Sequence, residues 1–472
     1  MKITELKVGA HIHLMGICGT AMASLAGLLK ELGFRVTGSE LNPYPPMSTQ
    51  IEDLGIKISK PYAAKNLDPR PDFVVVGNVI SANNEEAQEL MRLNIPFTSL
   101  PQAMGDVIIG NRESIVMAGT HGKTTTTSLM AWVTTQLNLN PGFLIGGIAK
   151  NFAKSFQVPK GNYFVIEGDE YDTAYFDKVP KFLHYKPRHV LLTSIEFDHA
   201  DIYKDLDAVK ASFLKLMELI PVEGSLVYCA EDENVEEVAR TCRAKNKISY
   251  GISRGDYRAQ VISVSETCTK FRISNSDFLV GEFETILSGD YNILNCTAVV
   301  ALAHTLKWDL AKVKTALASF QGVKRRQEIL GEPNGVLVIE DFAHHPTAVR
   351  ETLKGIREKY KGRKIFAIFE PRSATSRRKV FQKDYVEAFL QADEVLIMQA
   401  FDQSKIDEAN RFSSNELVAD IFRLGKPAKA FVAAEDIVKN LAPRVHKGDL
   451  VLIMSNGGFD GIYGKLLKAI GH

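Results

Sequence analysis

The 472-residue sequence has few cysteines and almost no net charge. Its five cysteines are scattered and none forms a Cys-X-X-Cys pair, which argues against a zinc ribbon and against a disulfide framework. A reducing, cytoplasmic location is therefore expected. The 57 Lys and Arg residues nearly balance the 56 Asp and Glu residues, leaving a formal charge of +1. We therefore expect no nucleic-acid partner, because such proteins usually carry a strong basic excess.

The sequence also lacks a hydrophobic run long enough to cross a membrane. Residues 14–29 carry no charge and follow Lys2 and Lys7, so they could imitate the core of a signal peptide. They are shorter than the roughly 20 residues that a membrane span needs, contain three glycines and run directly into Lys30 and Glu31. With 45% hydrophobic and 24% charged residues, the composition is that of a globular protein, and we expect no membrane partner.

Short apolar segments alternate with helical stretches along nearly the whole chain. These segments are rich in β-branched and aromatic residues, and they are continuous rather than alternating in polarity, which indicates strands buried on both faces. Parallel sheets covered by helices, and hence an α/β fold, are predicted. The clearest predicted strands are 11–15, 73–77, 114–118, 163–166, 189–195, 336–339, 364–369 and 450–454.

Two breaks in this pattern predict three segments, 1–106, 107–322 and 323–472. The first break lies between residues 100 and 112, after which a new strand and glycine loop begin. The second lies near residues 320–322 and precedes the basic cluster Lys324-Arg325-Arg326. Residues 253–285 differ from the rest because three short strands follow one another without a helix. We interpret them as an antiparallel edge added to the middle segment.

The stretch 114–125 has the sequence expected of a phosphate-binding loop. A strand leads into a glycine turn, and Lys-Thr then opens a helix. In such loops backbone N–H groups approach phosphate oxygens, the lysine reaches the β- and γ-phosphates, and the hydroxyl binds Mg²⁺. Met117 stands where the usual GxxxxGK[ST] spacing has its first glycine, so this loop is shorter; the competing interpretation is a turn that binds nothing. The predicted cradle comprises Gly119, Thr120, His121, Gly122, Lys123, Thr124 and Thr125.

Acidic residues follow two of the predicted central strands. One strand ends in Glu167, Asp169 and Glu170, and the next ends in Glu196-Phe-Asp198-His199. Hard oxygen ligands suit Mg²⁺, and α/β sheets bind ligands at the carboxyl ends of their strands. Each cluster alone could be a solvated loop with helix-capping acids. Together they favour the metal-holding acids of a nucleoside-triphosphate site.

The N-terminal segment opens with a second glycine turn. Gly16 and Gly19 follow the first strand, and the next strand ends at Ser39 and Glu40. This arrangement is similar to a dinucleotide fingerprint with a ribose-binding carboxylate, although Cys18 and Ala21 replace two of its glycines. It predicts a phosphate or diphosphate at a helix N-terminus without specifying NAD.

The C-terminal segment carries its candidates at strand ends as well. Asp341 precedes His344-His345-Pro346, whose spacing is wrong for a helical zinc site. These residues fit a nucleotide contact or a turn. Arg372 ends another strand and suits bidentate binding of a carboxylate, whereas Arg378 is better interpreted as solvated.

Three motifs, in this order and spacing, resemble those of the Mur ligase family. They are 119–125, 289–295 (Gly-Asp-Tyr-Asn-Ile-Leu-Asn) and Asp341 with residues 344–346. The resemblance covers essentially the whole chain. It implies a Rossmann-like N-terminal domain that binds a UDP-sugar, a central P-loop ATPase-like domain with a mostly parallel sheet, and a C-terminal Rossmann-like α/β domain.

Within the family, residues 16–22, 44–49 and 369–373 are most similar to members that attach a preformed murein tripeptide. The implied reaction joins UDP-N-acetylmuramate to L-Ala-γ-D-Glu-meso-diaminopimelate during peptidoglycan recycling, with ATP and Mg²⁺. ATP would convert the lactyl carboxylate to an acyl phosphate, which the peptide amine then attacks. The alternative within the family is addition of L-alanine in de novo peptidoglycan synthesis.

The resemblance also implies roles for individual residues. Lys123 would stabilise the transferring phosphoryl group, and Thr124, Glu167 and His199 would hold two Mg²⁺ ions. Adenine and ATP contacts would come from Asn292, Asn295, Arg326 and Asp341. UDP contacts would come from Gly16, Gly19, Ser39 and Glu40. Finally, His344 would help to place the reactants and Arg372 would bind a peptide carboxylate.

Two other classes of protein remain open from the residues. A nucleotide-gated regulatory ATPase would use the same P-loop without joining two substrates. An NAD-dependent oxidoreductase built on Gly16 and Gly19 ranks last, because hydride transfer needs neither the P-loop nor the two acidic strand ends. We expect a monomer or a weak homo-oligomer.

Overall fold

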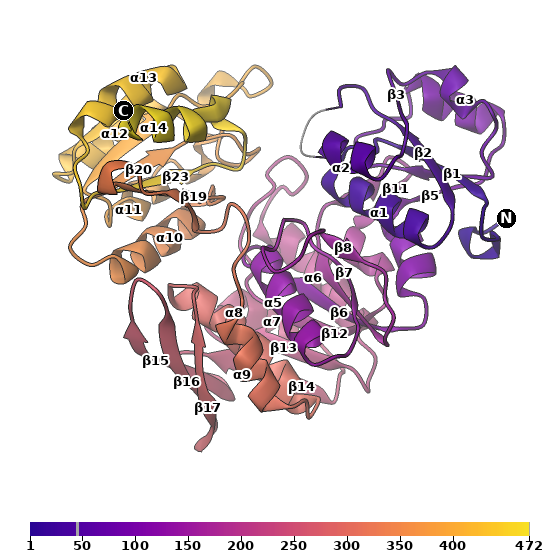
Figure 1. The fold of residues 1–472 in the computed structure, drawn as a ribbon, viewed down its shortest axis with the longest axis horizontal. Helices are drawn as coiled ribbons and strands as arrows, with labels where there is room; N and C mark the ends of the chain where they lie inside the picture. The colour runs from indigo at the N-terminus through magenta and orange to yellow at the C-terminus, as the bar shows by residue number, and fades with distance from the viewer. Residues whose placement is uncertain (44–46, 472) are drawn as a thin grey trace. The chain divides into compact units, whose positions relative to one another are not determined.

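The computed structural model describes residues 1–43 and 47–471, which fall into two units (Figure 1). The first unit contains Met1–Glu196, Asp207–Arg258 and Asn295–Phe320. The second contains Phe197–Leu206, Ala259–Leu294 and Gln321–His472. The chain therefore passes between the units several times, three times inside a single element: helix α6 (Leu206–Leu219), strand β15 (Tyr257–Val264) and helix α8 (Asp290–Thr305).

The N-terminal part of the first unit is a five-stranded parallel sheet with strand order β3-β2-β1-β4-β5. All five residues of β1 are buried, and the two histidines among them, His11 and His13, form hydrogen bonds inside the protein. The order reverses at β1, so the ends of β1 and β4 form the kind of crevice where α/β sheets bind ligands. The strands are β1 (His11–Met15), β2 (Arg35–Ser39), β3 (Ile58–Ser59), β4 (Phe73–Val76) and β5 (Phe97–Ser99), and the helices are α1 (Thr20–Glu31), α2 (Met47–Asp53), α3 (Glu85–Arg92) and α4 (Leu100–Ala103).

The central part of the first unit is a larger sheet with strand order β14-β13-β12-β6-β9-β7-β8. Its neighbours are parallel except for β8, which pairs antiparallel with β7. The strands are β6 (Glu113–Ala118), β7 (Gly142–Leu144), β8 (Phe156–Gln157), β9 (Tyr163–Gly168), β12 (Pro187–Leu192), β13 (Ser225–Cys229) and β14 (Asn246–Gly251), with a separate hairpin of β10 (Asp172–Ala174) and β11 (Asp177–Pro180). The helices are α5 (Lys123–Gln136), α6 (Leu206–Leu219), α7 (Glu233–Ala239) and α9 (Leu310–Ala318).

The second unit is built on a six-stranded sheet with order β18-β19-β23-β20-β21-β22, parallel except for β18. A second element of this unit is the antiparallel pair of β16 (Thr269–Asn275) and β17 (Phe278–Thr285). The strands of the main sheet are β18 (Glu328–Gly331), β19 (Leu337–Asp341), β20 (Ile365–Phe369), β21 (Glu394–Met398), β22 (Ala428–Phe431) and β23 (Leu450–Met454). The helices are α10 (Pro346–Lys359), α11 (Asp384–Ala388), α12 (Ser414–Arg423), α13 (Ala434–Leu441) and α14 (Ile462–Gly471).

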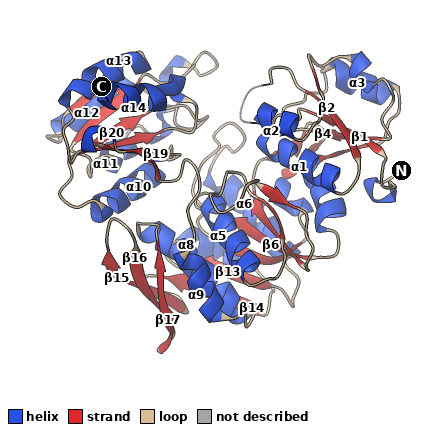
Figure 2. Ribbon diagram, viewed as in Figure 1, coloured by secondary structure: helices blue, strands red, loops and turns tan. Residues whose placement is uncertain are grey.

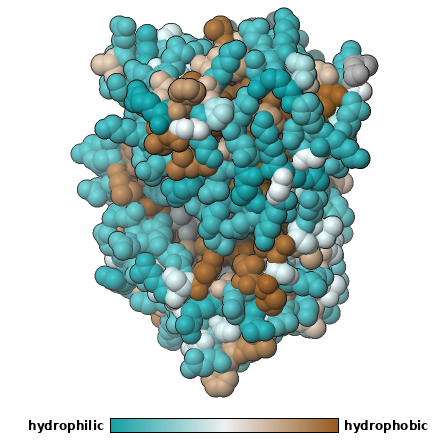
Figure 3. All heavy atoms as spheres, turned by 90° about the vertical axis from the view of Figure 1, so that its left-hand side faces the viewer, coloured by the Kyte–Doolittle hydropathy of each residue, from teal (hydrophilic) through white to brown (hydrophobic). Residues whose placement is uncertain are grey.

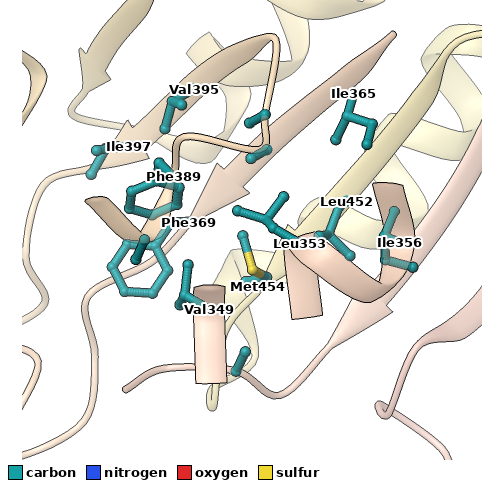
Figure 4. Close-up of a cluster of buried hydrophobic side chains, with 14 of the residues drawn as sticks. Val349, Leu353, Ile356, Ile365, Phe369, Phe389, Val395, Ile397, Leu452 and Met454 are labelled. Carbon is teal, nitrogen blue, oxygen red and sulfur yellow. The ribbon is translucent and has the colours of Figure 1, made fainter. Parts of the chain in front are cut away.

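Successive residues of the central strands in this sheet enter two different cores. Ile365, Ala367 and Phe369 pack with residues of α10, α11 and α12, whereas Phe366 and Ile368 pack with α13 and α14. Figure 4 shows the first core, with Val349 and Leu353 of α10 beside Phe369. Helices thus cover both faces of the sheet (Figure 2). Burial on both faces requires the continuous apolar strands that the sequence contains.

Among the residues that the structure describes, no helix is both long and apolar enough to cross a membrane. The face drawn in Figure 3 is mostly hydrophilic, and its apolar atoms lie in separate groups.

The predicted α/β fold class is confirmed, and every strand expected at 11–15 through 450–454 is present with ends shifted by a few residues. Two of the three strands predicted within 253–285 pair antiparallel, as expected, whereas β15 begins by pairing in parallel with β14. The boundaries 1–106, 107–322 and 323–472 stay a prediction. Tyr44, Pro45 and Pro46 of the 44–49 motif lie outside the described residues, and Met47 begins α2.

Helix α1 contains a glycine whose packing predicts an unusual stability effect. A Cβ at Gly27 would overlap the ring of Phe156, which is 2% exposed. Alanine in a helix is normally favoured over glycine by about 0.5–1 kcal/mol, but overpacking costs about 1–3 kcal/mol. Gly27→Ala is therefore expected to lower the midpoint of thermal unfolding. The matched control is Gly464→Ala on α14, where an added Cβ meets no atom within 4 Å and the midpoint should rise. A rise in both variants would contradict the packing argument.

Candidate active site

The glycine turn after β6 has the backbone geometry of a phosphate cradle. Gly119 has φ +127° and Gly122 has φ +81°, values that side chains rarely tolerate. A Cβ at Gly119 would lie 2.9 Å from the backbone nitrogen of Ser194, and one at Gly122 would lie 2.8 Å from Oδ1 of Asn295. Helix α5 begins at Lys123, so its N-terminus and partial positive charge adjoin the turn. Both glycines are therefore required by conformation and by space.

The ammonium group of Lys123 is held inside this turn. Its Nζ donates to the carbonyl oxygen of Gly119 at 2.6 Å and to both carboxylate oxygens of Glu170 at 3.1 and 2.9 Å. The Lys123 side chain is 16% exposed and that of Glu170 is 2% exposed. Burial opposes the charged form, but the carboxylates of Glu170, Asp169 and Glu167 outweigh it and raise the pKa of Lys123. The cradle therefore contains a permanent cation.

Glu167, near the end of β9, and Thr124, in the first turn of α5, place two oxygen groups in contact beside the cradle. Thr124 Oγ1 donates to Glu167 Oε2 at 3.1 Å, and the backbone N–H of Gly146 donates to Glu167 Oε1 at 2.5 Å. Asp169 accepts from Lys181 Nζ at 2.5 Å; burial opposes its ionisation, but Lys181 and Lys123 lower its pKa. A hydroxyl and a carboxylate in contact are the donor set that suits Mg²⁺. Thr124 and Glu167 therefore fit the magnesium site that the sequence predicts.

The segment after β12 fastens the other side of the turn. The N–H of Thr120 donates to the carbonyl of Ser194 at 2.8 Å, and the N–H of Glu196 donates to Thr120 Oγ1 at 2.9 Å. His121 Nε2 lies 2.8 Å from Glu196 Oε2. The first unit thus brings together one group of predicted residues. They are Gly119, Thr120, His121, Gly122, Lys123, Thr124, Thr125, Glu167 and Asn295.

Asn292 and Asp341 belong to the second unit, where two intermediate residues connect them. Asp341 Oδ2 accepts from the N–H of Gln327 at 2.8 Å, and Ser288 Oγ donates to Gln327 Oε1 at 2.9 Å. Asn292 Nδ2 donates to the carbonyl of Ser288 at 2.8 Å. Burial raises the pKa of Asp341. Phe342 follows Asp341, the last residue of β19, and the guanidinium of Arg326 lies 4.5 Å from the centre of the Phe342 ring.

His344 and His199 share a carboxylate neighbour in the second unit. Asp198 Oδ1 accepts from Thr375 Oγ1 at 2.6 Å and from the N–H of His199 at 2.7 Å, and its Oδ2 lies 3.8 Å from His344 Nε2. Burial opposes ionisation of Asp198, but the nearby imidazole of His344, together with His199 and the Thr375 hydroxyl, holds its pKa well below its usual range. Asp198 is therefore an anion that binds the backbone of His199 and lies close to the imidazole of His344.

Two neighbouring side chains hold the guanidinium of Arg372, which lies just after the end of β20. Its guanidinium lies 4.0 Å from the centre of the Phe401 ring, and its Nη1 donates to Glu370 Oε1 at 3.1 Å. A Cβ at Gly457 would overlap the Arg372 side chain, so glycine there leaves the space that the arginine occupies. Stacking and a buried carboxylate hold this guanidinium in one orientation, which suits bidentate carboxylate binding.

Hydrogen bonds to Ser39 and Glu40, at the end of β2, hold the glycine turn after β1. The backbone N–H groups of Gly16 and Ile17 donate to the carbonyl of Ser39 at 2.9 and 3.1 Å. Glu40 accepts from the N–H of Cys18 at 3.2 Å and from Tyr62 OH at 2.9 Å. Gly19 is the residue before α1. Ser39 and Glu40 thus hold the turn in shape, and their contact with a substrate stays a prediction.

Three family models match the chain in order. They are the Mur ligase family catalytic domain over residues 11–112, the Mur ligase middle domain over 117–303 and the Mur ligase glutamate ligase domain over 325–457. The chain belongs to the Mur ligase family.

Individual relatives of this Mur ligase match it over nearly its full length. It is 38% identical over 465 residues to the UDP-N-acetylmuramate–L-alanyl-γ-D-glutamyl-meso-2,6-diaminoheptandioate ligase of Escherichia coli (strain K12), covering 97% of this chain and 98% of that protein. It is 32% identical over 447 residues to the UDP-N-acetylmuramate–L-alanine ligase of Clostridium kluyveri (strain NBRC 12016), covering 94% and 95%.

Solved structures agree with these sequence matches. A murein peptide ligase from Psychrobacter arcticus 273-4 is similar with TM-score 0.72 and 34% identity, covering 98% of this chain and 99% of that one. A UDP-N-acetylmuramate–alanine ligase from Thermotoga maritima is similar with TM-score 0.80 and 25% identity, covering 97% and 98%. The three-domain architecture expected of a Mur ligase is therefore confirmed.

Two residues of this Mur ligase site were not singled out by the sequence. Glu170 was seen as one of three acids, but its pairing with Lys123 needs β9 beside β6, which only the sheet order provides. Thr375 lies 177 residues from Asp198, and no periodicity or spacing connects them. The only local signal for Thr375 was its hydroxyl in the polar Pro-Arg-Ser-Ala-Thr stretch that follows β20.

The Lys123–Glu170 pair of this Mur ligase leads to a prediction. Glu170→Gln leaves the largely buried ammonium with a weaker partner, which is expected to cost about 2 kcal/mol of stability, somewhat less than a fully buried pair. The variant should unfold at lower temperature than the wild type. Inorganic pyrophosphate should raise its unfolding midpoint more than that of the wild type, because the anion replaces the lost carboxylate. The control Glu237→Gln removes an exposed partner of Lys210 and should change neither value. Equal midpoints and responses in all three proteins would contradict the pairing argument.

Proposed function

We propose that this Mur ligase is an ATP-dependent, ADP-forming ligase that joins UDP-N-acetylmuramate to the tripeptide L-Ala-γ-D-Glu-meso-diaminopimelate in peptidoglycan recycling. The observation that carries the proposal is the Lys123 cradle, with Thr124 and Glu167 in contact beside it. The choice of tripeptide over L-alanine is supported by 38% identity to the E. coli ligase of that name, against 32% to the C. kluyveri alanine ligase.

The first step transfers the γ-phosphoryl group of ATP to the lactyl carboxylate of UDP-N-acetylmuramate. Lys123 stabilises the negative charge on the transferring group, because phosphoryl transfer depends on positioning and charge neutralisation. Thr124 and Glu167 would hold one Mg²⁺ ion, which would screen two anions from each other when bound there, and the family resemblance also implies a metal-holding role for His199. The product is an acyl phosphate, which must be protected from water.

The second step forms the amide bond. The N-terminal amine of the tripeptide attacks the acyl carbon, the bond between that carbon and the phosphate oxygen breaks, and inorganic phosphate leaves with the proton that the amine loses. We propose that His344, which lies close to Asp198, helps to place the reactants. Arg372, held by Phe401 and Glu370, binds a carboxylate of the tripeptide.

The remaining predicted residues serve the two nucleotides. Asn292 and Asn295 would contact adenine, and Arg326 and Asp341 would contact the rest of ATP. Gly16 and Gly19 would adjoin the UDP diphosphate at the start of α1, where the helix dipole favours anions.

A product assay tests this function directly. With UDP-N-acetylmuramate, ATP and Mg²⁺, the tripeptide is expected to give the UDP-N-acetylmuramoyl tripeptide and stoichiometric ADP, identified by mass spectrometry. Free L-alanine should react far more slowly. Preference for L-alanine would identify the alanine-adding enzyme instead, and phosphate release independent of any amine would favour a regulatory ATPase.

The P-loop assignment is tested by Lys123→Ala. The variant is expected to fold but to lose about a thousandfold or more in ligation rate, because the phosphoryl group loses its cation. Lys154→Ala is a suitable control, since Lys154 forms a half-exposed ion pair with Glu31. Thermal unfolding checks the fold of both variants. Near-wild-type turnover in Lys123→Ala would remove the P-loop from the mechanism.

A further inference from the structure

The N-terminal sheet contains a carboxylate that is completely buried. Glu86, in the first turn of α3, is 0% exposed. A buried carboxylate is unfavourable unless hydrogen bonds replace its hydration. Oε1 accepts from His13 Nε2 at 2.8 Å and from Ser39 Oγ at 2.7 Å. Oε2 accepts from Asn66 Nδ2 at 2.8 Å and from the N–H of Ala63 at 3.3 Å.

These four bonds fill the carboxylate, because each oxygen accepts about two hydrogen bonds. Burial opposes ionisation of Glu86, but its bonds to His13, Asn66 and Ser39 outweigh burial and lower its pKa. Glu86 is therefore an anion whose acceptor capacity is used entirely within the protein. It does not act as a ligand-binding group.

The donors come from the segments that form the carboxyl edge of the sheet. Ser39 ends β2, and its carbonyl oxygen accepts the N–H groups of Gly16 and Ile17. Glu86 thus fixes the residue on which the first glycine turn rests. The segment with Ala63 and Asn66 follows Tyr62, whose hydroxyl donates to Glu40, and Glu40 in turn holds the N–H of Cys18. The two residues that hold the glycine turn, Ser39 and Glu40, are therefore both connected to the carboxylate of Glu86.

A histidine chain extends this network into the sheet. Because Nε2 of His13 donates to Glu86, its Nδ1 is the acceptor for the Thr37 hydroxyl at 2.8 Å when the ring is neutral. Nε2 of His11 lies 2.8 Å from the same hydroxyl. Every donor then has an acceptor. Such a fully satisfied buried network has one preferred arrangement and makes the edge rigid.

We infer that Glu86 is a positioning residue for the sugar nucleotide: it holds the glycine turn and Ser39 in the shape that receives the diphosphate. The inference rests on the proposed function, in which Gly16 and Gly19 adjoin UDP. The P-loop belongs to the other sheet of this unit, so the effect of Glu86 is confined to one substrate.

The test uses Glu86→Gln in the full-length protein. Glutamine has nearly the same shape, but it presents an NH₂ group where two donors converge, so at least one bond of the network is lost. The KM for UDP-N-acetylmuramate is expected to rise about tenfold, whereas kcat and the KM for ATP should stay within twofold. Titration with UDP alone, followed by calorimetry, should show the same weakening without turnover.

Two further variants make the test specific. Glu89→Gln lies on the same helix but removes only the partner of exposed Arg92, and it should leave every constant unchanged. Ser39→Ala removes one of the four donors and should raise the same KM by a smaller factor. This variant decides the question if Glu86→Gln does not fold.

The outcomes separate this inference from the proposed function. A wild-type protein that does not use UDP-N-acetylmuramate contradicts the function, and the UDP titration still tests Glu86. An unchanged KM and unchanged UDP affinity in folded Glu86→Gln overturn the inference. A parallel loss of ATP and UDP affinity with a lower unfolding midpoint also overturns it, because that pattern indicates a general structural role.

Discussion

The ion pair between Lys123 and Glu170 is the interaction on which the nucleotide end of the molecule depends. It places a cation inside the glycine turn before any phosphate arrives, and it links the start of α5 to the end of β9. Three carboxylates, Glu167, Asp169 and Glu170, surround two ammonium groups, Lys123 and Lys181. Counted as ionised, these five groups carry one excess negative charge. The cradle is therefore suited to a triphosphate that arrives with a divalent cation rather than to a bare anion.

Each sheet presents its chemistry at the carboxyl ends of its strands, and each does so with a different supporting charge. In the central sheet the supporting group is the cation Lys123. At the N-terminal sheet it is the buried anion Glu86, and in the second unit it is two carboxylates, Asp198 beside His344 and Glu370 bound to Arg372. Parallel strands gather polar ends at one edge, and burial on both faces leaves that edge as the natural place for polar groups.

The sequence predicted what depends on neighbouring residues. Continuous apolar runs such as β20 and β23 predicted the strands, and Gly119, Gly122 and Lys123 predicted the cradle, because conformation and helix start are local properties. It did not predict which distant groups meet. His13 and Glu86 are 73 residues apart, and their contact follows from where α3 returns to the sheet. No local pattern distinguishes the buried Glu86 from an exposed acid, because the burial of a charge depends on residues that are distant in the sequence.

The two glycine turns show why similar sequences need not bind similar ligands. A dinucleotide fingerprint offers the amides of its turn to a diphosphate. Here the N–H groups of Gly16 and Ile17 are occupied by the Ser39 carbonyl, and a carboxylate, Glu40, accepts from Cys18. Those amides therefore already have acceptors, whereas the P-loop offers a phosphate Lys123. A nucleotide at this edge, which is UDP in the proposed function, is therefore expected to lie against the start of α1, which the turn positions, rather than to bind the N–H groups of Gly16 and Ile17.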